Sequence, residues 1–158
     1  MMNTQYKNSQ TGWLMLVLFT LIPIQITVSY LRLGQAHVPT TVFVILLVLF
    51  IGLIITFYKL TVKADKECIH LIYGLGLVHI RIRPQAVTEV KIVNTPWYYG
   101  YGIRFTPKGM LYNIQGSSAV QMTYLDSKTT NGKLKTVMIG TNDASGLQKF
   151  LQQEYGLI

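Results

Sequence analysis

Charged residues are scarce in this chain, and acidic ones are the scarcest. Only 13% of the 158 residues are charged and half are hydrophobic, whereas about 25% are charged in a typical soluble domain. This deficit indicates that part of the chain lies in lipid. The 14 Lys and Arg residues outnumber the 6 Asp and Glu residues, which gives a formal net charge of +8. Such an excess favours anionic partners such as phospholipid, nucleic acid or an acidic protein.

The residues that usually carry chemistry are also few. Cys68 is the only cysteine, so the chain cannot form an internal disulfide, and a reducing compartment is the simplest interpretation. No GxSxG motif is present, and no two carboxylates have a spacing typical of acid–base catalysis. A cluster of Cys68, His70 and His79 can be drawn, but a solvated polar face explains these residues better than a metal site, which needs three or four ligands. We expect no catalysis, no metal, no cofactor and no small-molecule substrate.

Two long runs contain no charge at all. Residues 13–31 and residues 38–58 are uncharged and mostly apolar, and each run is long enough to cross a bilayer core of about 30 Å as a helix. The connector, residues 32–37, is so short that the two spans must be antiparallel. A cleaved signal peptide explains the first run less well, because its basic region is one lysine and no small-residue cleavage site follows.

The distribution of lysine and arginine predicts the orientation of this hairpin. Lys59, Lys63 and Lys66 follow the second run, whereas Arg32 is the only lysine or arginine of the connector. The positive-inside rule therefore predicts a cytoplasmic tail at residues 1–12, an external connector and a cytoplasmic C-terminal part. Aromatic and basic residues at the ends of the spans are expected to anchor them at the membrane interfaces: Trp13, Tyr30, Tyr58, Lys59 and Lys63.

After residue 58, apolar and polar residues alternate between regular turn signals, which indicates a β domain over residues 59–158. Strands are expected at residues 59–65, 87–93, 103–105, 110–114, 119–125 and 134–140, with a hairpin over residues 66–83. A two-residue turn at Gly74 and Leu75 would place Leu71 opposite Val78 and Ile69 opposite Ile80, with all four facing the core.

The period changes near the end of the chain. Leu147, Phe150 and Leu151 form an i, i+3, i+4 stripe, which predicts an amphipathic helix. Thr141 or Asn142 is expected to be its N-cap, with Asp143 near its positive end, and Gly156 is expected to end it.

Two stretches give the chain a resemblance to a known family. They are "PWYYGYGIRFTPKGMLYNIQG" (residues 96–116) and "VMIGTNDASGLQKFL" (residues 137–151), and both follow the helical hairpin. In this order the chain resembles the bacterial pleckstrin-homology-like (PH-like) domain proteins of the inner membrane. The resemblance implies a membrane α-helical hairpin plus an α+β or all-β PH-like domain. That domain would have about seven antiparallel strands in a half-open barrel closed by the C-terminal amphipathic helix. The resemblance implies no reaction.

The aromatic part of the first stretch has three possible interpretations. It resembles an RNA-binding strand, but Ile103 stands where a stacking aromatic is needed, so we expect no nucleic acid. It could be a sheet corner turned by Gly100 and Gly102 and filled by aromatics. It could also be a contact surface for a protein partner or lipid, made of large amphipathic and basic side chains: Trp97, Tyr98, Tyr99, Tyr101, Arg104 and Lys108.

These observations predict a non-catalytic integral protein of the bacterial inner membrane, with its PH-like domain on the cytoplasmic face. The domain would bind a protein partner or a second copy, with β-addition of a partner segment as a plausible mechanism. The alternative is a module that binds or senses anionic lipid. From residue 59 onward there are 12 basic and 6 acidic residues, and each basic residue near an anionic membrane contributes roughly 1 kcal/mol of attraction.

Overall fold

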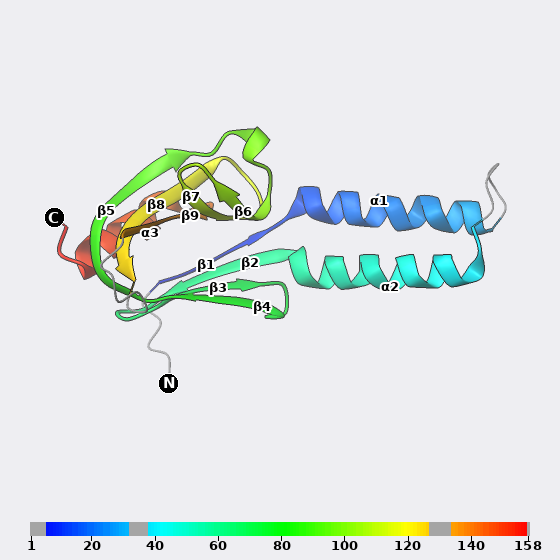
Figure 1. Cartoon of the computed structure of the whole chain (residues 1–158), viewed down its shortest axis with the longest axis horizontal. Helices are drawn as coiled ribbons and strands as arrows, with labels where there is room; N and C mark the ends of the chain where they lie inside the picture. The colour runs from blue at the N-terminus through cyan, green and yellow to red at the C-terminus, as the bar shows by residue number, and fades with distance from the viewer. Residues whose placement is uncertain (1–5, 32–37, 127–133, 158) are drawn as a thin grey trace.

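The computed structural model describes residues 6–31, 38–126 and 134–157. Helices α1 (Trp13–Tyr30) and α2 (Thr40–Phe57) lie side by side and project from one end of a β domain (Figure 1). The connector at residues 32–37 lies outside the described residues. The two helices confirm the two predicted apolar runs to within about two residues at each end, which is the usual uncertainty of a helix boundary.

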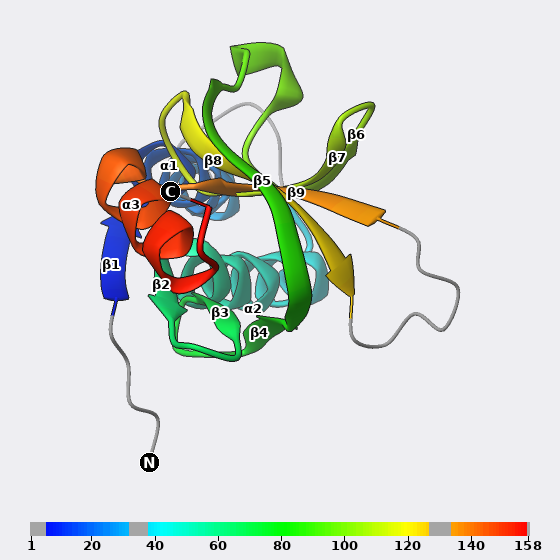
Figure 2. The same cartoon turned by 90° about the vertical axis from the view of Figure 1, so that its left-hand side faces the viewer.

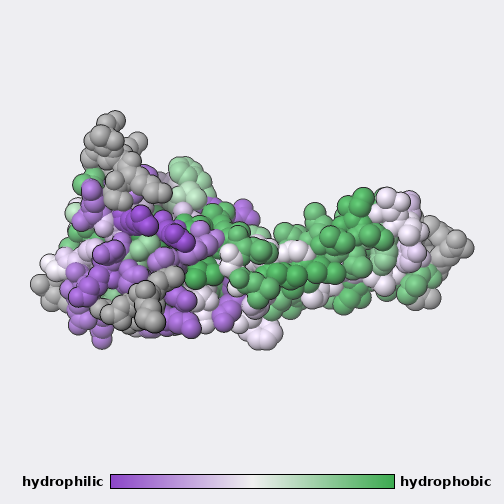
Figure 3. Space-filling view, turned by 90° about the horizontal axis from the view of Figure 1, so that it is seen from below, coloured by the Kyte–Doolittle hydropathy of each residue, from purple (hydrophilic) through white to green (hydrophobic). Residues whose placement is uncertain are grey.

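Both helices are long and apolar enough to cross a membrane, and none of their residues is buried within the described structure. At about 1.5 Å per residue, 18 residues span roughly 27 Å. Their surface is strongly hydrophobic, whereas much of the β domain is hydrophilic (Figure 3). The hydroxyls of Thr20, Thr27 and Thr56 donate to carbonyls four residues earlier in the same helix, so these polar groups are satisfied without water.

The predicted tail contains a strand, β1 (Tyr6–Thr11), which pairs antiparallel with β2 (Lys59–Ala64). The sequence of β1 gives no apolar–polar alternation, because Gln10, the residue that the strand buries, is polar. The side-chain amide of Gln10 donates to the Gly140 carbonyl (3.0 Å). The pairing continues past the strands, where the Gly12 N–H donates to the Tyr58 carbonyl (2.9 Å). The helical hairpin therefore continues directly from the β1–β2 ladder.

The strands form two sheets. The first has the order β1-β2-β3-β4, with β3 (Ile69–Tyr73) and β4 (Val78–Ile82). The second has the order β5-β8-β9-β7-β6. Its strands are β5 (Pro84–Asn94), β6 (Gly102–Thr106), β7 (Gly109–Asn113), β8 (Ser118–Asp126) and β9 (Leu134–Gly140), with a 3-10 helix, η1 (Trp97–Tyr99), between β5 and β6.

The expectation of about seven antiparallel strands in one barrel is wrong. The described residues form nine strands in two open sheets, and β7 pairs with β9 in parallel. Figure 2 shows β4 and the β6–β7 hairpin well apart at one side of the domain. Alternation along the chain indicates where strands occur, but the choice of partner depends on contacts between residues distant in sequence.

The predicted β3–β4 hairpin exists, but the predicted register differs from the observed register by two residues. Leu71 pairs with Ile80, and Tyr73 pairs with Val78. The turn spans residues 74–77 because Gly74 (φ 55°) and Gly76 (φ 99°) both adopt positive φ angles, so the loop has four residues instead of two. A shift of two keeps every side chain on its predicted face, and Ile69 and Leu71 are indeed fully buried.

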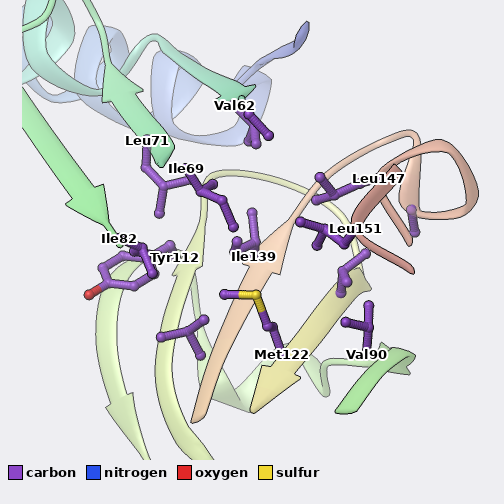
Figure 4. Packing of buried hydrophobic residues seen from close by; sticks show 14 of the residues in the cluster. Val62, Ile69, Leu71, Ile82, Val90, Tyr112, Met122, Ile139, Leu147 and Leu151 are labelled. Atoms are coloured by element: carbon purple, nitrogen blue, oxygen red, sulfur yellow. The ribbon is translucent and has the colours of Figure 1, made fainter. Parts of the chain in front are cut away.

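The core lies between the two sheets and the C-terminal helix α3 (Ala144–Glu154) (Figure 4). Leu147 and Leu151 are fully buried, which confirms the predicted stripe. The N-cap is Asp143, one residue after the predicted positions, and its carboxylate accepts from the Gly146 N–H (2.9 Å). A Cβ at position 146 would collide with that carboxylate, which explains a glycine in the first turn of a helix.

Candidate functional site

The predicted aromatic segment forms the corner between β5 and β6. Tyr98 is 67% exposed, and its ring meets that of Tyr99 edge to face at 5.1 Å. Tyr99 packs against the small buried cluster of Leu111, Ala119 and Met138, so Tyr99 is part of the structure of the corner. The side chain of Trp97 lies outside the described part of the structure.

The structure separates the predicted basic residues from one another. The Arg104 side chain is exposed and turns back to the corner, where its Nε donates to the Tyr101 carbonyl (3.1 Å). Lys108 is exposed in the turn that follows β6. Strand β6 itself is about 13 Å long from Gly102 to Thr106, at about 3.3 Å per residue. Tyr101 is half-buried. Of the five predicted residues whose side chains the structure describes, Tyr99 packs inward and Lys108 lies in the β6–β7 turn, so these five do not form one surface.

Four of the five predicted membrane anchors lie at the ends of the helices. Trp13 begins α1, and its backbone N–H donates to the side-chain oxygen of Gln115 (2.8 Å). Tyr58 and Lys59 join α2 to β2, and Tyr30 ends α1, where its ring stacks on Phe43 at 4.2 Å. Lys63 lies four residues further along β2, or about 13 Å from Lys59.

Strand β6 is an open edge of the five-stranded sheet. Among the described strands it pairs with β7 alone. Alternate backbone N–H and C=O groups along its other side are therefore available to an additional strand.

The inner face of β6 is also uncovered. Ile103 lies opposite Tyr112, and Phe105 lies opposite Met110. Directly opposed residues share a face of the sheet, and Tyr112 belongs to the main core. Ile103 and Phe105 therefore continue the core-facing side, yet they are 37% and 85% exposed. The four-stranded sheet does not extend far enough to cover them.

A pocket of about 570 Å³ lies beside this uncovered edge. Its volume is within the range of about 300–1,000 Å³ that is usual for ligand sites. It is lined by the β6–β7 turn and by the facing parts of β8 and β9: residues 105–110, Tyr112, Tyr124 and residues 134–137. These residues offer apolar surface, the phenols of Tyr112 and Tyr124 and the ammonium groups of Lys108 and Lys135.

The charges of the pocket follow from its neighbours. Lys135 Nζ lies 2.6 Å from the Asp126 carboxylate, so this cation is already paired. Burial, with Asp126 nearby, raises the pKa of Tyr124 to about 12, and burial also raises the pKa of Tyr112. Both phenols therefore stay neutral near pH 7. Lys108, exposed at the rim, adds positive charge.

The two histidines form a hydrogen-bonded pair, and the prediction of a solvated polar face is wrong for Cys68 and His70, which are both buried. His70 Nδ1 lies 2.8 Å from His79 Nε2, and no group of three metal-ligating side chains occurs within residues 6–31, 38–126 and 134–157. Burial first, and then the His79 ring, lower the pKa of His70 even though the Asp65 carboxylate lies 3.7 Å away. Burial and the Arg81 charge lower the pKa of His79.

The outer face of the first sheet carries a basic row. The strand registers place one such residue from each strand side by side: Lys7 on β1, Lys63 on β2, His70 on β3 and Arg81 on β4. We call these four residues the basic row. Neither the row nor the uncovered inner face of β6 could be located in the sequence, because both depend on which strands pair. The alternation of apolar and polar residues in "IRF" (residues 103–105) was the only local signal for the uncovered inner face of β6.

Comparison with protein-family models, with curated proteins and with solved structures finds no match to this chain.

Proposed function

We propose that this is a non-catalytic membrane protein that binds a partner protein through a PH-like domain. In this proposal α1 and α2 span the bacterial inner membrane, with both ends of the hairpin in the cytoplasm. The uncovered helices support the membrane placement, because exposed apolar surface of this extent requires lipid or another apolar cover. The two sheets and the helix α3 packed against them agree with the PH-like interpretation in outline, although the strands do not form one seven-stranded barrel.

The binding proposal rests on two features that occur together in β6: one side of its backbone is unpaired, and the apolar side chains of Ile103 and Phe105 on its inner face are exposed. A partner segment that adds as a strand to β6 would satisfy the free N–H and C=O groups of that strand. Every second side chain of the segment would then point to the face of Ile103 and Phe105, beside the pocket. Lys108 at the rim favours an acidic residue at one end of the segment.

The test is photo-crosslinking in the full-length protein in its own membrane. A photoreactive residue replaces Phe105 on β6 or, as a control, Ile92, which is an exposed apolar residue on β5, the other edge strand of the same sheet. We expect one recurrent protein adduct from position 105 only, lost in Ile103→Asp and retained in Ile92→Asp. The same adducts from both positions, or no protein adduct from position 105, would contradict the proposal.

The basic row favours a second candidate, a module that binds anionic lipid. Lys7, Lys63 and Arg81 carry positive charge across one face of the first sheet, and anionic headgroups attract such cations. His70 lies among them but adds no charge near pH 7, because burial lowers its pKa. The row lies four strand residues beyond Lys59, which is roughly 13 Å from the end of α2. This distance exceeds one Debye length at physiological salt, so the attraction requires the sheet to approach the membrane surface. Reconstitution in vesicles with and without anionic lipid, followed by hydrogen exchange of β1 to β4, separates the candidates. Protection that rises with anionic lipid and falls with salt supports the lipid module.

A further inference from the structure

The β3–β4 turn presents two uncovered leucines that neither proposed function uses. Leu75 and Leu77 are 73% and 69% exposed. Isolated apolar residues on a surface need no explanation. These two differ because they share one four-residue turn and because that turn is held against the apolar helix α2.

The contacts of Gly74 set the position of the turn. Its N–H donates to the Lys59 carbonyl (2.7 Å), at the first residue after the α2–β2 junction. A Cβ at position 74 would collide with the carbonyl oxygens of Ile55 and Thr56, so the turn backbone packs directly on the last turn of α2. The Tyr73 ring meets the Phe57 ring edge to face at 5.9 Å. The turn is therefore level with the end of the helix.

The surroundings of the turn are hydrophobic on the side of the helices. Ile55, in the last turn of α2, is itself exposed. In Figure 3 the hydrophobic surface does not stop where the helices meet the domain but continues onto the adjoining end of the domain. Figure 1 shows the β3–β4 turn at that end. Leu75 and Leu77 thus extend an apolar surface that α2 already presents.

We propose that Leu75 and Leu77 insert into the lipid at the interface of the bilayer that α1 and α2 span. The turn is then a third contact with the membrane, made by a hairpin and not by a helix. On the other helix, Trp13 occupies the corresponding level at the start of α1 and is likewise exposed. With contacts on both sides of the hairpin, the domain is held at one tilt to the membrane. The placement of the turn rests on the proposed function, since it requires that the helices span a bilayer.

The test uses single cysteines labelled with an environment-sensitive fluorophore in the full-length protein, in a Cys68→Ala background. Leu75→Cys and Leu77→Cys report on the turn. Leu49→Cys, in the middle of α2, reports on the span, and Leu134→Cys is the matched control, because Leu134 is an exposed leucine at the start of β9. Each variant is reconstituted in phosphatidylcholine–phosphatidylglycerol vesicles with or without brominated lipid, which quenches labels within the apolar layer.

We expect loss of emission in brominated lipid at positions 49, 75 and 77 and unchanged emission at position 134. Loss at position 49 with unchanged emission at both 75 and 77 would overturn the insertion of the turn while leaving the membrane placement intact. Unchanged emission at position 49 would overturn the membrane placement itself. The two turn positions are independent readings, so a variant that fails to fold at one of them leaves the other to decide.

Discussion

The edge strands β1 and β6 are similar in length and opposite in environment. Strand β1 is covered by other elements. The Tyr6 ring stacks on Phe150 of α3 at 5.9 Å, its hydroxyl lies 3.3 Å from the Asp143 carboxylate, and Gln10 bonds to the end of β9. Strand β6 exposes Ile103 and Phe105, with a pocket beside them. Figure 2 shows α3 lying beside β1, whereas none of the described helices and strands covers the β6–β7 hairpin.

The difference indicates how this domain uses its edges. An uncovered edge strand invites pairing with another chain, and natural proteins usually cover or interrupt such edges. Here a polar strand is secured by side-chain contacts, whereas the strand with the apolar inner face is left open. The comparison predicts that changes on β1 lower stability and changes on β6 lower binding.

The largest effect on stability is expected from Tyr6→Ala. The change removes a half-buried ring from Phe150, together with the hydrogen bond that the hydroxyl shares between the carbonyl and the carboxylate of Asp143. We expect a loss of about 2 kcal/mol in the free energy of unfolding, less than the 3–5 kcal/mol typical of fully buried aromatics. The urea midpoint of the full-length protein in detergent measures it. Tyr6→Phe keeps the ring and should lose about 1 kcal/mol; equal losses in the two variants would show that the ring packing contributes nothing.

A smaller loss is expected from Asp143→Ala. Its carboxylate caps α3 by accepting from the Gly146 N–H and also lies 3.3 Å from the Tyr6 hydroxyl. Loss of an N-cap costs about 1 kcal/mol. Asp143→Asn, which can still cap, should retain most of the stability. Additive losses in the Tyr6→Phe, Asp143→Ala double variant would contradict a shared contact between β1 and α3.

Acid is expected to weaken the first sheet more than the second. Folding lowers the pKa of His70 and of His79 from 6.5, so the unfolded chain binds their protons more readily. Their contribution to stability is therefore full above about pH 6.5 and decreases as the pH falls below it. Hydrogen exchange at pH 7.5 and 5.5, corrected for intrinsic rates, should show protection lost mainly in β3 and β4. His79→Gln should reduce this dependence; an unchanged pH dependence would exclude the histidine pair as its cause.

The smallest effect on stability is expected from Phe105→Ala. The side chain is 85% exposed, and substitutions at exposed positions usually change stability by less than about 0.5 kcal/mol. The same variant should weaken recovery of the partner crosslinked from a photoreactive residue at Ile103. A clear drop in the urea midpoint would show that Phe105 is part of the fold, and the contrast between the two edges would then fail.

The candidate site could be predicted only in part. The glycines and aromatics of residues 97–102 correctly indicated a corner, because turn chemistry is local. The strands expected at residues 103–105 and 110–114 already placed Lys108 in the turn between them, but the sequence could not indicate that Tyr99 packs inward. Phe105 was expected only as part of an ordinary strand, since alternation identifies the face of a residue but not whether another sheet covers that face.

Local patterns in the sequence account for the two apolar helices, eight of the nine described strands and the buried stripe of α3. Each of these depends on periodicity or on turn residues within a short window. Only the tertiary structure determined that residues 6–11 form a strand, that β7 and β9 run parallel, and that the β3–β4 turn has four residues. It also determined that the two sheets stay open at β6. These outcomes depend on pairing between segments far apart in the chain, where packing and hydrogen bonding of the whole domain outweigh local preference.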